Sequence, residues 1–180
     1  WPNFSRASSW AEGDVVRIAT DASSDTVFKG SMCFVAGNGD YRLRTRETKA
    51  STDELELEAL TLALKYLLKV GARKAVIESD SVAALEAVEQ IVHKRGSKAS
   101  RPGRTWRGVS SGARSRFQQA WGDIQGQCEV DIRRVLGHAG DPLNRAADQI
   151  AYMGLRAIAH PMKQSRETLR EGIQKALSAL

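Results

Sequence analysis

The sequence predicts a single α/β domain, and three features carry this prediction. The runs Val15 to Thr20 and Lys74 to Ser79 are rich in apolar and β-branched residues, as in strands buried on both faces. A long stretch with leucines at helical spacing separates the two runs. If the two strands are neighbours, this stretch is their right-handed crossover. A chain of 180 residues is long enough for one domain with a substantial core.

The first half of the chain predicts three strands and a helix. A strand over 15–21 is followed by a polar loop at 22–26 and a second strand over 27–36. The turn Gly37-Asn38-Gly39-Asp40 favours a hairpin, because Asn and Gly accept positive φ. A third strand over 41–48 carries arginines at alternate positions, which is typical of an edge strand with one wet face. Ser51 and Glu54 have capping-box spacing and open a helix that ends at Gly71.

The second half of the chain predicts two more strands and four helices. The strand over 74–79 precedes a helix over 82–92. A short helix is expected over 110–121, and an alternating pattern predicts a strand over 128–136. A helix begins near Leu143, and a last amphipathic helix spans 162–180. We therefore divide the chain into a tail at 1–13, pinned by Trp1 or Trp10, a domain at 14–158 and a C-terminal helical extension at 159–180. That extension docks on the domain or on a partner, and the sequence does not choose between them.

Composition narrows the class of protein. Hydrophobic residues make up 42% and charged residues 27% of the chain, as in ordinary globular proteins. No apolar run reaches the roughly 20 residues of a membrane span, and the first residues lack a signal-peptide pattern. We therefore expect no membrane partner and a cytoplasmic, or at least intracellular, location. Cys33 and Cys128 are expected to be small buried residues without a disulfide.

The net charge of +6 favours a polyanionic partner, and its distribution is uneven. The segment at about 93–116 contains eight Lys or Arg residues and no acid. We predict that it is an arm that grips phosphates, with one aromatic contact; the alternative is a solvated, flexible excursion. The proposed contacts are Lys94, Arg95, Lys98, Arg101, Arg104, Trp106 and Arg107.

Four acids stand at unusual places in the predicted elements. Asp21 and Asp80 stand at the carboxyl ends of buried strands, whereas Glu56 and Asp148 border apolar helix faces. Taken singly, Asp21 could cap a turn, and Glu56 could be a solvated acid favoured by the helix dipole. If the four converge, their repulsion requires a cation, and Mg²⁺ is the usual occupant of a part-hydrated carboxylate site. Two such ions suit phosphoryl displacement.

Four motifs in order resemble those of type 1 ribonuclease H. They are Thr20-Asp21-Ala22-Ser23, Glu56-Leu57-Glu58-Ala59-Leu60, Ser79-Asp80-Ser81, and the run from Gly137-His138-Ala139-Gly140 to Ala147-Asp148. The resemblance covers about residues 15–152. It implies the RNase H-like fold, a five-stranded mixed sheet flanked by helices. It also implies Mg²⁺- or Mn²⁺-dependent cleavage of the RNA strand of RNA–DNA hybrids, leaving 3′-hydroxyl and 5′-phosphate ends.

The resemblance also implies roles for individual residues. Asp21 would bridge two metal ions, with Glu56 and Asp80 on one ion and Asp148 on the other. His138 would help a proton leave or help release product. Asn144 would anchor the junction between loop and helix beside the site, and the basic segment would be a substrate-gripping handle.

The chain departs from the family pattern around the substrate face. Ala22 replaces a common Gly, and Thr52 and Asp53 stand where two Asn residues often touch the hybrid. Ser23 and Thr52 are our candidates for contacts to the 2′-hydroxyls that distinguish RNA from DNA. Two rival functions stay open: a nuclease of the same superfamily that cuts DNA or junctions, and a module that binds nucleic acid without cutting it.

Overall fold

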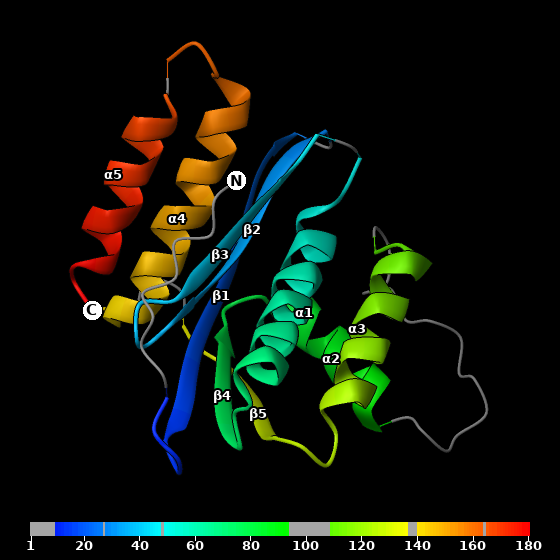
Figure 1. Cartoon of the computed structure of the whole chain (residues 1–180). Helices are drawn as coiled ribbons and strands as arrows, with labels where there is room; N and C mark the ends of the chain where they lie inside the picture. Colours follow the sequence, from blue (N-terminus) through cyan, green and yellow to red (C-terminus); the bar gives the residue numbers. More distant parts are fainter. Residues whose placement is uncertain (1–9, 27, 48, 94–108, 137–139, 164) are drawn as a thin grey trace.

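The structure is a computed structural model that describes residues 10–26, 28–47, 49–93, 109–136, 140–163 and 165–180. Five strands form one mixed sheet in the order β3-β2-β1-β4-β5 (Figure 1). The strands are β1 (Val15–Thr26), β2 (Lys29–Ala36), β3 (Tyr41–Arg46), β4 (Lys74–Ser79) and β5 (Glu129–Arg134). β1 pairs antiparallel with β2 and parallel with β4, and β4 pairs parallel with β5. The predicted five-stranded mixed sheet is therefore confirmed.

Helices cover both faces of this sheet, as Figure 1 shows. One side carries α1 (Thr52–Val70), α2 (Val82–His93) and α3 (Ser111–Ile124). The other side carries α4 (Pro142–Ala159), with α5 (Arg166–Leu177) packed against it. None of the helices in the described ranges is both long and apolar enough to span a bilayer.

The core is split into two clusters by the sheet. Val16 and Ile18 of β1 face the α1 side, whereas Ala19 faces the α4 side. Cys128 lies in the first cluster and Cys33 in the second, and both are free and buried, as predicted. This alternation along β1 follows from the two-residue period of a strand.

Several predicted boundaries are confirmed and others are wrong. Ser51 caps α1 by accepting from Glu54 N, and Gly71 ends the helix with φ 68°. The predicted loop at 22–26 is wrong: these residues continue β1, because they pair with β2 as far as Thr26 and Lys29. The last helix begins at Arg166 rather than near 162, because Ser165 caps it by accepting from Thr168 N.

The last strand is shorter than the predicted 128–136, and the N-terminal tail is held at one described residue. β5 covers Glu129–Arg134 only, since its pairing with β4 ends where β4 ends, at Ser79 and Arg134. The tail is fixed at Trp10, whose Nε1 donates to the Tyr66 hydroxyl at 2.9 Å. Trp1 lies outside the described residues.

Candidate functional site

Asp21 lies inside β1, at the point where the partner on one side is lost. The parallel pairing of β1 with β4 extends to Ala19 and Glu78, whereas the antiparallel pairing with β2 continues past Asp21. The prediction that Asp21 ends its strand is therefore wrong, but Asp21 does lie just beyond the parallel ladder. That position corresponds to the carboxyl edge where sites form in α/β sheets.

Asp80 and Glu56 reach the same edge from two other elements. Asp80 directly follows β4, whose last paired residue is Ser79. Glu56 belongs to the second turn of α1 and is 5% exposed. Because Ser51 fixes the start of α1, and leucines such as Leu57 and Leu60 hold it on the core, the phase of the helix turns Glu56 inward.

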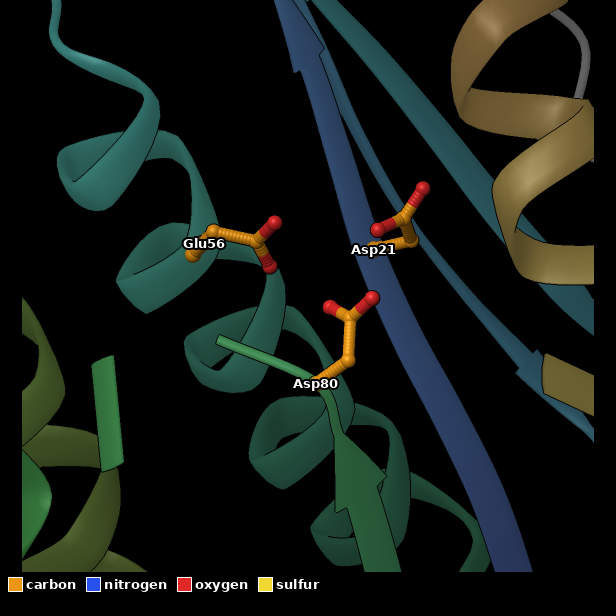
Figure 2. Close-up of side chains that lie close together, drawn as sticks. All are labelled: Asp21, Glu56 and Asp80. Carbon is orange, nitrogen blue, oxygen red and sulfur yellow. The ribbon is translucent and has the colours of Figure 1, made fainter. Parts of the chain in front are cut away.

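The three carboxylates point toward one another (Figure 2). One oxygen from each of Asp21, Glu56 and Asp80 lies within 4.8 Å of the others. Three acids from a strand, a helix and a strand end thus share one small volume, although 35 residues separate Asp21 from Glu56 and 24 separate Glu56 from Asp80. This is the convergence that the sequence predicts for three of the four acids.

The electrostatics of the cluster are unfavourable without a cation. Burial, and then the charges of Asp80 and Asp148, raise the pKa of Asp21 from 3.8 to about 7. Burial, and then the charges of Asp21 and Asp80, raise the pKa of Glu56 well above its ordinary value. The Ala22 backbone N–H opposes both rises. The ionised forms of Asp21 and Glu56 are thus disfavoured, and a positive charge between the carboxylates would be strongly stabilised.

An orphaned oxygen supports the same conclusion. Glu56 Oε2 is buried and has no hydrogen-bond partner among the described residues. A buried polar atom without a partner costs free energy unless a ligand satisfies it. The donor set is all oxygen and anionic, which suits a hard divalent cation such as Mg²⁺. The residues present therefore fit a divalent metal ion.

Asp148, the fourth acid, belongs to α4. It is exposed, and it lines a cavity of about 150 Å³ together with Asp21, Asp80 and the 8%-exposed Asn144. It is not one of the three carboxylates that lie mutually within 4.8 Å. The structure thus brings the fourth predicted acid to the same cavity but leaves it farther from the cluster.

An arginine that the sequence analysis did not single out fixes the other side of this cavity. Arg17 Nη2 donates to Glu78 Oε2 at 2.8 Å and to Asp141 Oδ2 at 2.6 Å. Glu78 is on β4, and Asp141 is the N-cap residue of α4. This link ties the beginning of α4, and hence Asp148, to the sheet. Charged residues within two otherwise apolar strands were the available signal for it.

Some of the predicted substrate contacts lie within the described residues, and others lie outside them. Ser23 is partly buried on β1, and exposed Thr52 begins α1, with its Oγ1 2.7 Å from Ser24 Oγ. His138 and the predicted phosphate contacts of the basic segment lie outside the described residues. Those contacts are Lys94, Arg95, Lys98, Arg101, Arg104, Trp106 and Arg107.

The described end of the basic segment is attached to α1. Ser110 N donates to Glu54 Oε2 at 2.7 Å, and Arg116 forms an ion pair with Glu58. Glu58 also pairs with Arg46 of β3 at 3.1 Å. The charge of Arg116 is therefore compensated by Glu58 of α1, although the segment at 93–116 itself contains no acid.

Comparisons with known proteins agree with this geometry. A family model described as RNase H matches residues 13–156. Among solved structures, the chain is similar to the N-terminal RNase H domain of Rv2228c from Mycobacterium tuberculosis, determined as a fusion with maltose-binding protein. The identity is 18% and the TM-score 0.58, over 82% of this chain and 97% of that one. No curated protein matches the chain.

Proposed function

Because the chain belongs to the RNase H family, we propose that it is a metal-dependent endoribonuclease that hydrolyses the RNA strand of RNA–DNA hybrids. The observation that carries the proposal is the meeting of Asp21, Glu56 and Asp80 within 4.8 Å at the sheet edge. Three carboxylates this close together have no evident structural purpose at this position. They have a clear one as ligands for cations that act on phosphate.

Asp21, Glu56 and Asp80 would hold the first divalent ion, Mg²⁺ by preference with Mn²⁺ as a substitute. Asp21 and Asp148 would hold a second ion across the cavity that both acids line. When bound, such a pair stabilises the attacking and leaving oxygens of an in-line phosphoryl displacement. The raised pKa of Asp21 means that its proton must be released for it to act as a ligand.

The chain's other residues would orient the substrate. Asn144, in the first turn of α4, lies on the cavity wall. There it would anchor the junction between the preceding loop and α4, beside the reacting phosphate. Ser23 and Thr52 are proposed to contact 2′-hydroxyls, and the basic segment is proposed to hold the substrate through its phosphates. His138 is proposed to move a proton or assist product release. The products would be 5′-phosphate and 3′-hydroxyl ends, and the setting intracellular.

Cleavage of matched substrates tests the proposal. A labelled RNA is presented as RNA–DNA hybrid, single strand and RNA duplex, beside a DNA duplex of the same sequence, with Mg²⁺ or with EDTA. We expect cutting of the hybrid in Mg²⁺ only, and a loss of at least about 100-fold in Asp21→Asn. The exposed Asp123→Asn on α3 is the matched control and should keep full activity. Intact hybrid with folded protein and ample metal would refute the proposal, and preferential cutting of DNA would favour the DNA-directed alternative.

A further inference from the structure

A groove runs between α4 and α5 on the face of the molecule opposite α1. The two helices lie side by side there (Figure 1), and the space between them measures about 540 Å³. Its walls include Arg145, Gln149 and Tyr152 of α4, with Gly172 and Lys175 of α5. At Gly172 a Cβ would lie 2.5 Å from Met153 Sδ, so the glycine lets the two helices approach closely.

The lining combines positive charge with an exposed aromatic ring. Arg145 and Lys175 are cations on opposite walls, and no carboxylate lines the groove within the described ranges. Tyr152 is 52% exposed, a large exposure for an aromatic side chain, and the Arg156 guanidinium lies 6.0 Å from its ring centroid. Cations that grip a phosphate backbone, beside an aromatic ring on which a base stacks, are the chemistry of single-strand binding.

The groove adjoins the candidate active site, with one arginine between them. Arg145 lines both the groove and the cavity that contains Asp21, Asp80 and Asp148. From Arg145, one side of α4 presents Gln149, Tyr152 and Arg156 at spacings of three and four residues, which places them on one face. At 1.5 Å per residue this row is about 16 Å long, so it can follow only a few nucleotides of a strand. A strand leaving the cavity past Arg145 would meet this row directly.

We propose that the α4–α5 groove binds a single strand of nucleic acid that continues past the cleavage site. Lys175 and Arg145 contact its phosphates, and Tyr152 stacks on one of its bases. The inference rests on the proposed function, because it takes the strand from the site described above. It also gives the C-terminal helix a role, since α5 lies beyond the residues that the family model matches.

Binding of substrates with and without an extension tests the groove. The full chain is titrated, in EDTA to prevent cutting, against a labelled short hybrid and against the same hybrid with about five unpaired nucleotides at either end of either strand. For at least one extension we expect the native chain to bind several times more tightly than to the blunt hybrid. The double substitution Tyr152→Ala, Lys175→Gln should remove this gain and leave the affinity for the blunt hybrid within about twofold. Lys175→Gln alone should lower the salt slope for that substrate by about 0.7, the value for one phosphate contact of a single strand.

The matched control is Lys69→Gln, because Lys69 is likewise an exposed lysine in the last turn of its helix. It should leave every affinity unchanged. The inference is overturned if none of the extensions adds affinity, or if the double variant retains the gain or loses affinity equally for the blunt hybrid. Cutting of the blunt hybrid in Mg²⁺ is measured separately. If the chain cuts the blunt hybrid but no extension adds affinity, the proposed function stands and only the proposal for the groove is refuted.

Discussion

Asp21 makes the stability of the metal-free protein depend on pH, and the stability falls as the pH rises. Its pKa rises from 3.8 to about 7 on folding, chiefly through burial and then through Asp80 and Asp148. The folded chain therefore binds this proton more tightly than the unfolded chain does. The stabilisation is complete below about pH 3.8 and is lost as the pH rises through about 7. Glu56 contributes in the same direction.

Urea unfolding in EDTA at pH 5 and pH 8 measures this effect. We expect the free energy of unfolding of the native chain to fall toward pH 8, by at most about 1.4 kcal/mol per pH unit for each group. Asp21→Asn cannot ionise at this position, so its free energy of unfolding should fall less. Equal pH dependence in the two proteins would show that Asp21 ionises normally in the fold.

Arg17 is predicted to be a positioning residue of the cavity. Arg17→Met keeps much of the side-chain stem but leaves Glu78, 7% exposed, without its cation and releases Asp141 at the start of α4. We expect a loss of about 1–3 kcal/mol in unfolding free energy, the lower part of the range for such pairs because Arg17 is 47% exposed.

A second cross-strand pair provides the control. Lys74 and Glu129 pair at 3.4 Å between β4 and β5, with both side chains more than half exposed. Lys74→Met should change the stability by less than about 0.5 kcal/mol. A similar cost for both substitutions would mean that the Arg17 link does not hold α4 in place.

At the scale of elements, α4 must lie tightly on the sheet for Asp148 to reach the cavity. A Cβ at Gly154 would lie 2.6 Å from Leu43 Cδ1 and 3.1 Å from Ser31 Cβ. Gly154→Ala should therefore destabilise the fold by about 1–3 kcal/mol through overpacking. It should also lower the cleavage rate, because α4 is displaced.

Gly122 in α3 is the matched glycine, since nothing lies within 4 Å of a Cβ there. Gly122→Ala should be neutral or stabilise by up to about 1 kcal/mol, because alanine is the better helix former. Thermal melting of both variants measures the contrast. If Gly154→Ala were as stable as Gly122→Ala, the close contact between α4 and the sheet would be disproved.

Local patterns were sufficient to predict most elements. The leucine spacing, the Ser51 cap and Gly71 predict α1 to within a residue, because each signal lies inside the helix it defines. The sequence pattern does not predict the extension of β1 to Thr26, because its polar residues are held by pairing with β2 and not by their own propensity. The last helix was predicted too long, because its apolar stripe does not indicate where the cap lies.

At the scale of the whole molecule, the sequence predicts the acids of the site better than the ion pairs that hold the surrounding elements in place. Acids at unusual places in the predicted elements, repeated in order along the chain, indicate Asp21, Glu56 and Asp80 from the sequence alone. The link from Arg17 to Glu78 and Asp141 spans 124 residues, and no member taken alone identifies its partners. Such pairings depend on the register between β1 and β4, which the sequence does not specify.

The central claim is that carboxylates from β1, α1 and β4 hold a divalent cation. Anomalous diffraction from crystals of the chain grown with Mn²⁺ tests it most directly. We predict a strong anomalous peak at about 2.0–2.2 Å from oxygens of Asp21, Glu56 and Asp80, and its loss in Asp21→Asn crystals. Well-ordered carboxylates with no peak between them, at Mn²⁺ concentrations that occupy other sites in the crystal, would contradict the account.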